Sequence, residues 1–384
     1  MADRSYRYEN RSKMMISHEQ KILTWAAGMA PDEEHLQHIR LGMPKIADAS
    51  RLIDLAVKEG LTGFLYKSLL KAGVLDTLIP QHKQKLYNNY YLTIRHNLKL
   101  IHALNEILGP LNQTDIQVVL MQGISLLQQV YRDIGLRPMS DMDIWVLPHQ
   151  YAALADYLIG QGFERNGIYP DTFSKGEVLL DIHTRILWGD RIQSRDKLIN
   201  IDQEEIFKNA RIINVENTAA LCLNPVDQFL YLSLHALKHN LERLIWLADI
   251  KCLVAAWELA DWQALMIRAE EMGQKATLFY MLFVLTRIFE FKLPAEISAY
   301  LDGWNPNPFE RRVLNRRING SSIPTWSQLL LMSAGKGIRG RLALVKETLL
   351  PRPKILRQVF PGASNLSDGQ LYWKRVLQIL GSFK

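Results

Sequence analysis

Residues 120–146 have the sequence LMQGISLLQQVYRDIGLRPMSDMDIWV, and this stretch decides the fold class. A short β-branched run over 116–121 predicts a strand, and the apolar segment over 123–131 that follows it predicts a short helix. Residues 141–146 alternate between polar and apolar side chains, which predicts a second strand. A strand, a glycine at 123, a helix and a strand in this order indicate a small α/β core.

Helical patterns flank this core on both sides. Residues 84–108 repeat apolar side chains at helical spacing and are followed by Gly109-Pro110, which predicts one long amphipathic helix that ends there. The helical spacing resumes at Pro225. Three short runs between the helical regions predict further strands: 163–168, 178–186 and 211–215. We therefore expect a predominantly helical α+β fold with a small mixed sheet, divided into an N-terminal helical region (1–110), an α/β core (111–222) and a C-terminal helical region with a basic tail (223–384).

Two carboxylates begin the second predicted strand of the core. Because side chains alternate along a strand, Asp141 and Asp143 project from the same face, about 7 Å apart. Like charges at this separation repel each other, and a divalent cation between them would remove the repulsion. Mg²⁺ prefers carboxylate oxygens together with substrate phosphates, so Asp141 and Asp143 are candidate metal ligands.

A third carboxylate, Asp181, lies near the end of another apolar strand pattern. Three acids on adjacent strands are the arrangement that two-metal phosphoryl or nucleotidyl transfer requires. Upstream, Gly123 at the start of a helix would let a phosphate approach the backbone N–H groups, and Ser125 could add a hydroxyl. Two arginines are nearby cations for a triphosphate: Arg132 and Arg137.

This stretch resembles the nucleotidyltransferase-like family of bacterial proteins, within the polymerase-β-type nucleotidyltransferase superfamily. Family members typically have a strand that ends in Lys-Gly, a helix that ends in Tyr, and then Arg-Pro-Met-Ser-Asp-x-Asp before an apolar strand. The matching residues here are Gln122-Gly123, Tyr131, residues 137–143 (RPMSDMD), residues 180–183 (LDIH) and residues 235–249 (HALKHNLERLIWLAD). The resemblance covers about residues 90–360.

The resemblance implies an enzyme that uses Mg²⁺ or Mn²⁺ and transfers a nucleoside monophosphate from a nucleoside triphosphate to a hydroxyl or phosphate of an acceptor. The acceptor, a small molecule, peptide or protein, is not identified by the sequence, and an accessory tailoring role is expected. The expected metal ligands and catalytic residues are Asp141, Asp143 and Asp181, of which Asp181 also helps to deprotonate the nucleophile. The expected nucleotide-binding residues are Gln122, Gly123, Ser125, Arg137 and Ser140.

Two other functions stay open at this point. Gln122 replaces the lysine usual before the glycine, and Ile124 stands where the wider superfamily tends to have Ser. These departures favour a catalytically weak or inactive adaptor that keeps the fold and binds a nucleotide, peptide or protein. A toxin-like or RNA-modifying transferase is the third hypothesis.

The composition excludes several classes of protein. The chain has 384 residues, of which 48% are hydrophobic and 22% charged, which is typical of a globular protein. Its two cysteines, Cys222 and Cys252, are too few for a disulfide framework and suggest a reduced compartment. Residues 1–13 lack the apolar segment of a secretory signal, and the apolar run over 278–285 is too short to span a membrane. We therefore expect a cytoplasmic protein without a membrane span.

The net charge of +7 is unevenly distributed. Residues 311–384 contain 14 basic and 2 acidic side chains, a net charge of +12, so the first 310 residues together carry −5. This asymmetry makes nucleic-acid binding by the whole protein possible but not favoured. It predicts that most cations able to meet a triphosphate or an anionic acceptor lie in the tail, unless the tail is only a solvated helical face.

Two features near residue 240 have simpler interpretations. His235 and His239 have the spacing of a helical zinc pair, but Ala236 stands where a zinc protease has its Glu. We expect these histidines to line a helix that faces the active site or to be core residues. Arg243 and Asp249 are interpreted as a buried ion pair that orients their helix toward the core.

Overall fold

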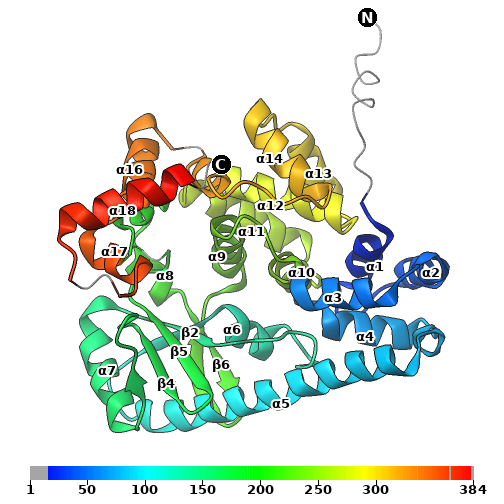
Figure 1. Ribbon diagram of the computed structural model, residues 1–384, viewed down its shortest axis with the longest axis horizontal. Helices are drawn as coiled ribbons and strands as arrows, with labels where there is room; N and C mark the ends of the chain where they lie inside the picture. The colour runs from blue at the N-terminus through cyan, green and yellow to red at the C-terminus, as the bar shows by residue number, and fades with distance from the viewer. Residues whose placement is uncertain (1–15, 188, 190, 335, 363–364, 382–384) are drawn as a thin grey trace, which may run out of the picture.

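The computed structural model describes residues 16–187, 189, 191–334, 336–362 and 365–381. Within these residues, helices surround one mixed sheet of seven strands, which confirms the predicted helix-rich α+β fold (Figure 1). One cluster of buried apolar side chains extends from Ile22 to Leu344 and so through all three expected regions. The region boundaries at 110/111 and 222/223 stay predictions.

The helices before the sheet form a compact N-terminal group. They are α1 (His18–Ala26), α2 (Glu33–Gly42), α3 (Ala49–Glu59), α4 (Thr62–Lys71) and the long α5 (Pro80–Leu111). Helix α5 begins with Pro80, where a proline needs no hydrogen-bonded N–H. It continues two residues beyond Gly109, so the predicted end at Gly109-Pro110 is too early. A proline this close to the C-terminus removes a single helical hydrogen bond, which the last turn tolerates.

The sheet has the strand order β3-β4-β5-β2-β1-β7-β6. Its strands are β1 (Val118–Met121), β2 (Met142–Val146), β3 (Glu164–Arg165), β4 (Thr172–Lys175), β5 (Val178–His183), β6 (Arg211–Val215) and β7 (Thr218–Cys222). The strand predicted over 163–168 is therefore only two residues long, and the one predicted over 178–186 ends at His183. Strands β4 and β7 were not predicted. Strand β2 pairs antiparallel with β1 and parallel with β5, so the sheet is mixed, as expected.

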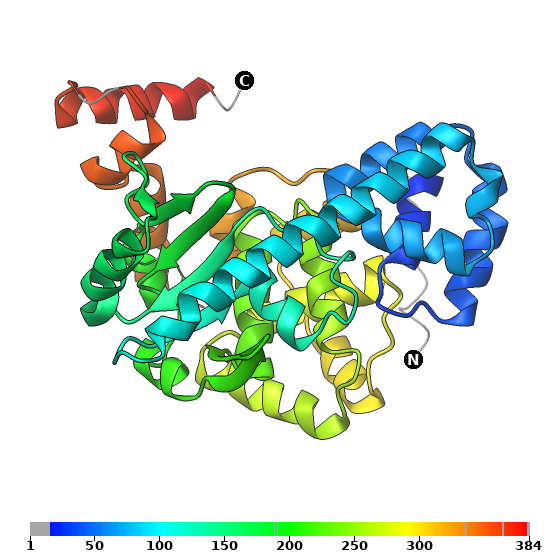
Figure 2. The same cartoon turned by 90° about the horizontal axis from the view of Figure 1, so that it is seen from below.

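Helices cover the sheet and its ends. Helix α5 runs across the sheet and contacts β5, β6 and β7 (Figure 2). The helices within the α/β core are α6 (Gln122–Gln129), α7 (Tyr151–Gly160) and α8 (Gln203–Lys208). Trp145 of β2 is fully buried and packs edge-on against Phe207 of α8, with ring centroids 5.0 Å apart. Beyond Asp143, strand β2 is therefore buried on both faces.

The C-terminal helices return to the sheet. Four of them confirm the helical spacing found after Pro225: α9 (Pro225–Lys238), α10 (Leu244–Leu253), α11 (Leu259–Glu271) and α12 (Lys275–Ile288). The basic tail follows α13 (Ala295–Asp302) and forms α14 (Pro308–Ile318), α15 (Ser327–Met332), α16 (Ile338–Leu349), α17 (Pro353–Val359) and α18 (Asp368–Gly381). The Tyr169 hydroxyl donates to the Gln358 carbonyl oxygen at 3.4 Å, so α17 lies beside the loop before β4. Among the described helices, none combines the length and the hydropathy that crossing a membrane requires.

The contact between α4 and the loop before β2 gives a first test of this packing. A Cβ at Gly63 would collide with the backbone carbonyl of Gly135. We expect Gly63→Ala to lower the free energy of unfolding in urea by about 1–3 kcal/mol, because the loop must shift. The matched control is Gly160→Ala at the end of α7, where a Cβ meets nothing within 4 Å. Equal stability of the two variants would contradict this close approach.

Candidate active site

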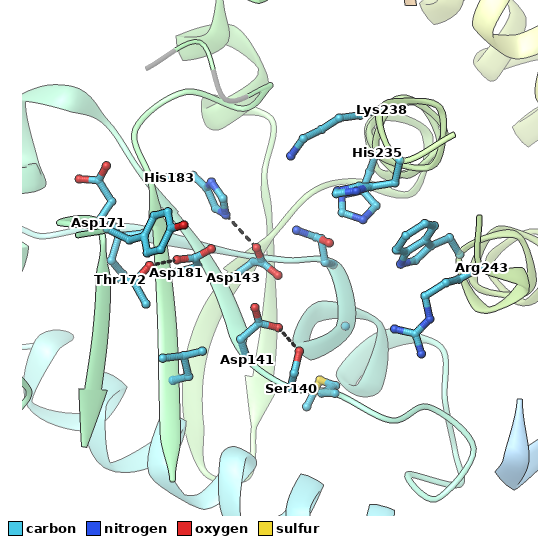
Figure 3. A pocket seen from close by; sticks show the side chains of 18 of the residues that line it. Ser140, Asp141, Asp143, Asp171, Thr172, Asp181, His183, His235, Lys238 and Arg243 are labelled. Carbon is cyan, nitrogen blue, oxygen red and sulfur yellow. Dashed lines mark hydrogen bonds and ion pairs between the residues drawn. The ribbon is translucent and has the colours of Figure 1, made fainter. Parts of the chain in front are cut away.

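The pairing of β2 with β5 places two carboxylates beside each other. Asp143 lies opposite Asp181 in the parallel ladder. His183 follows Asp181 by two residues and therefore points to the same face, where its Nε2 lies 2.8 Å from Asp143 Oδ1 (Figure 3). One possible ligand atom from each of these three side chains lies within 4.8 Å of the other two. Sequence analysis did not select His183, although the period of two from Asp181 could have found it.

The first acid of the Asp-x-Asp motif lies next to this cluster. Ser140 donates a hydrogen bond from Oγ to Asp141 Oδ1 at 2.9 Å. Burial, and next to it the charge of Asp143, raises the pKa of Asp141 above its ordinary value. Thr172 of β4 donates from Oγ1 to Asp181. Asp143 and Asp181 both destabilise the charged form of Asp141, and the charge of a divalent cation would remove this repulsion.

A cavity of about 740 Å³ opens in front of these acids. Its walls come from the start of α6, the loop before β2, strands β4 and β5, helices α9 and α10, and Gln358 of α17. The predicted residues that line it are Gln122, Gly123, Arg137, Ser140, Asp141, Asp143 and Asp181. Pockets of 300–1,000 Å³ are typical of small-molecule and cofactor sites, so the volume suits a substrate of nucleotide size.

The start of α6 differs from the phosphate-binding site that the sequence predicted at Gln122, Gly123 and Ser125. Gln122 has a φ of 49°, a left-handed conformation that a non-glycine residue rarely adopts. A Cβ at Gly123 would meet the Arg137 guanidinium and the Met139 sulfur, so this glycine makes room for Arg137. Ser125 is 1% exposed, accepts hydrogen bonds from Gln129 and Gln228, and does not line the cavity.

Arg137 forms a buried ion pair with Asp249 of α10. Its Nη2 lies 2.9 Å from Asp249 Oδ2, with side chains 11% and 1% exposed. The hydroxyl of Tyr131 donates to Asp249 Oδ1 at 2.7 Å. The expected pairing of Asp249 with Arg243 is therefore wrong, because the loop between α6 and β2 supplies the arginine instead. This pair ties the Asp-x-Asp loop to α10, and Arg137 positions the loop as well as lining the cavity.

His235 and His239 lie on the wall of the cavity, as expected. Burial lowers the pKa of His239 to about 4 and holds the pKa of His235 well below its ordinary value. Both rings are therefore neutral at pH 7. The His239 ring also lies 5.0 Å from that of Trp246. Within the described part of the chain, the metal-binding geometry of three or more side chains occurs only at Asp143, Asp181 and His183, so the histidine pair has no third ligand.

The cations of the cavity come from the first 310 residues. They are Arg137, Arg191, Lys238 and Arg243, whereas Arg132 is exposed and does not line the cavity. Burial lowers the pKa of Arg243 from its ordinary value. For this cavity, the expectation that the basic tail supplies most of the cations is wrong. The described tail contributes the amide of Gln358 to the wall instead.

The buried ion pair predicts a large effect on stability. Asp249→Asn leaves the Arg137 guanidinium buried without a counter-charge, and we expect the free energy of unfolding to fall by about 3–5 kcal/mol. Urea unfolding followed by circular dichroism measures this change. Asp368→Asn is the control, because its ion pair with Arg357 is 57% and 40% exposed and should contribute less than about 1 kcal/mol. A loss at Asp249 no larger than at Asp368 would contradict the role of the pair.

Removing the charge of Asp141 should stabilise the protein, whereas removing that of Asp249 should destabilise it, because burial and the charge of Asp143 disfavour the Asp141 carboxylate. The raised pKa means that the metal-free folded protein loses stability as pH rises through that pKa. At pH 7 in EDTA we expect Asp141→Asn to stabilise the protein by about 1 kcal/mol. Added Mn²⁺ should then stabilise the natural protein more than the variant. The exposed Asp156→Asn on α7 should change neither value, and a destabilised Asp141→Asn in EDTA would contradict the account.

A comparison with protein-family models places these motifs in a wider context. The model described as "Uncharacterised nucleotidyltransferase" matches residues 46–290, which is more than half of the chain and includes the acids, α6 and α10. No curated protein and no solved structure matches the chain. The match confirms the resemblance found in the Asp-x-Asp stretch. The chain belongs to this nucleotidyltransferase family.

Proposed function

We propose that this protein is a divalent-cation-dependent nucleotidyltransferase that transfers a nucleoside monophosphate from a nucleoside triphosphate to a hydroxyl or phosphate of an acceptor. The single observation that carries the proposal is the register of β2 on β5, with Asp143 opposite Asp181. Family membership supports the transferase class and a nucleoside triphosphate as substrate. The proposal adds the ion and the roles of individual residues.

The side chains present fit a divalent cation. Asp143 and Asp181 would hold it, with Asp141 beside them. Such a cation supplies charge neutralisation for the phosphates and a template for in-line attack. His183 holds the Asp143 carboxylate by a hydrogen bond, and Thr172 does the same for Asp181. The oxygen ligands favour Mg²⁺, while the nearby imidazole would also suit Mn²⁺.

The cavity offers a place for each part of a nucleotide. Lys238 at the end of α9 and Arg243 directly before α10 lie across the cavity from Asp181 and would meet the triphosphate (Figure 3). The neutral ring of His239 and the indole of Trp246 have centroids 5.0 Å apart and planes tilted by 38°, and each gives an aromatic surface against which a base could pack. Gln122 lines the same wall, where a family member would have Lys. Its amide can donate a hydrogen bond to a phosphate but adds no charge.

The reaction is a displacement at the α-phosphorus. An acceptor oxygen forms the new bond to this phosphorus, the bond to the bridging oxygen breaks, and pyrophosphate leaves. The proton of an acceptor hydroxyl passes to Asp181. Catalysis in such a site depends on positioning and on electrostatic stabilisation of the charge that develops in the transition state.

The metal-dependent part of nucleotide binding tests the proposal. Calorimetry with Mg²⁺ or Mn²⁺ and each of the four nucleoside triphosphates should show binding that EDTA abolishes. Asp143→Asn should weaken it by at least about tenfold, because one carboxylate ligand is lost while the side chain keeps its shape. Asp156→Asn should bind as the natural protein does. Nucleotide binding that neither EDTA nor Asp143→Asn changes would contradict the proposed metal site.

An adaptor without catalysis is the second candidate, and Gln122 favours it. It would bind a nucleotide but release no pyrophosphate with any acceptor. Assay of pyrophosphate from the natural protein and from Gln122→Lys separates the two candidates. Release by the natural protein supports the transferase. Release by the lysine variant alone would identify Gln122 as the reason for lost activity.

A further inference from the structure

A second, smaller cavity of about 250 Å³ adjoins the main one. The two share Asp171, Arg191 and Gln358 in their walls. In Figure 3, Asp171 lies on one side of the Asp143–Asp181 pair, and Lys238 and Arg243 lie on the other. The smaller cavity therefore opens on the side of the acids that the proposed triphosphate position leaves free.

The walls of the smaller cavity carry an excess of positive charge. Arg191, Arg352 and Lys354 line it, against the single carboxylate of Asp171. Asp171 already accepts a hydrogen bond from the Tyr151 hydroxyl at 2.7 Å. Lys354 is exposed at the start of α17 and forms no ion pair with any residue that the structure describes. An anion in this cavity would balance the charge of Lys354.

Two of these cations interact with neighbouring residues. The Arg191 guanidinium donates to Gln358 Oε1 at 3.1 Å and lies 5.7 Å from the centre of the Tyr169 ring. Arg352 interacts with Glu347, a residue outside the cavity wall. The Glu347 carboxylate is held by the backbone N–H groups of residues 193 and 194. Arg191 is thus held at the opening by Gln358 and Tyr169, and Lys354 remains the adjustable charge.

The volume limits what can enter. A cavity of about 250 Å³ lies below the 300–1,000 Å³ typical of complete ligand sites. It can take a phosphate or carboxylate group but not a nucleotide. The rest of such a molecule would extend past Asp171 and Thr172 into the main cavity, toward Asp181.

We propose that the smaller cavity binds an anionic group of the acceptor, so that the acceptor of this transferase is itself negatively charged. This inference rests on the proposed function, which puts the attacking oxygen beside Asp181. It assigns the basic tail a defined role, because Arg352 and Lys354 belong to the segment with a net charge of +12. The anionic group anchors one end of the acceptor while its hydroxyl or phosphate oxygen reaches the α-phosphorus.

The test uses inorganic phosphate and succinate as probes, titrated into the full chain without nucleotide or metal and followed by calorimetry. Lys354→Glu should weaken the tighter-bound probe by about tenfold or more, because it replaces a charged hydrogen-bond donor by a carboxylate that repels the anion. The matched control Lys346→Glu makes the same charge change at an exposed position in α16 that lines neither cavity. A preference for phosphate indicates a phosphorylated acceptor, and a preference for succinate indicates a carboxylated one.

One further variant, Arg243→Gln, separates this inference from the proposed function. Arg243→Gln should weaken nucleotide binding and leave phosphate binding unchanged, whereas Lys354→Glu should do the reverse. Probe binding that is absent, or equal in Lys354→Glu and Lys346→Glu, overturns the anion site even if nucleotides bind. Probe binding that depends on Lys354 supports the anion site, and failure of nucleotides to bind in the same preparation would contradict only the transferase.

Discussion

The site depends on the parallel pairing of β2 with β5, which forces Asp143 and Asp181 to lie side by side. Two flanking pairs, Met142 with Leu180 and Ile144 with Ile182, are buried and fix the register. A slip of β2 by one residue would turn Asp143 into the core and Met142 and Ile144 outward. The hydrophobic core thus supplies the free energy that holds like charges together, and a cation bound between them would remove the repulsion.

A second constraint links this sheet to the helices that follow it. The Asp-x-Asp loop is held by the buried pair of Arg137 and Asp249, which joins segments 112 residues apart in the sequence. Gly123 makes room for that arginine, and the preceding Gln122 adopts a left-handed conformation where β1 turns into α6. Strain at such a position is common in sites that bind ligands. The loop, α6 and α10 therefore form one rigid wall of the cavity.

Local patterns were sufficient to predict the strand, glycine, helix and Asp-x-Asp strand, because each depends on spacing within a few residues. They also predicted α9 to α12 and, together with the family resemblance, seven of the residues that line the cavity. Strands β4 and β7 escaped prediction because four or five residues of mixed polarity give little periodic signal, and their pairing with β5, β1 and β6 is not local. The ion-pair partner of Asp249 was not predicted either, because this contact is also not local in the sequence. The sequence offers Arg243 six residues away, whereas the fold brings Arg137 from another segment.

Anomalous diffraction from crystals soaked with Mn²⁺ and a non-hydrolysable nucleoside triphosphate analogue would test the central claim most directly. The account predicts an anomalous peak within about 2.3 Å of carboxylate oxygens of both Asp143 and Asp181, with the triphosphate directed toward Lys238 and Arg243. A nucleotide bound in the cavity without a metal at these acids would contradict it. So would a metal that binds elsewhere while the Asp143–Asp181 pair stays empty.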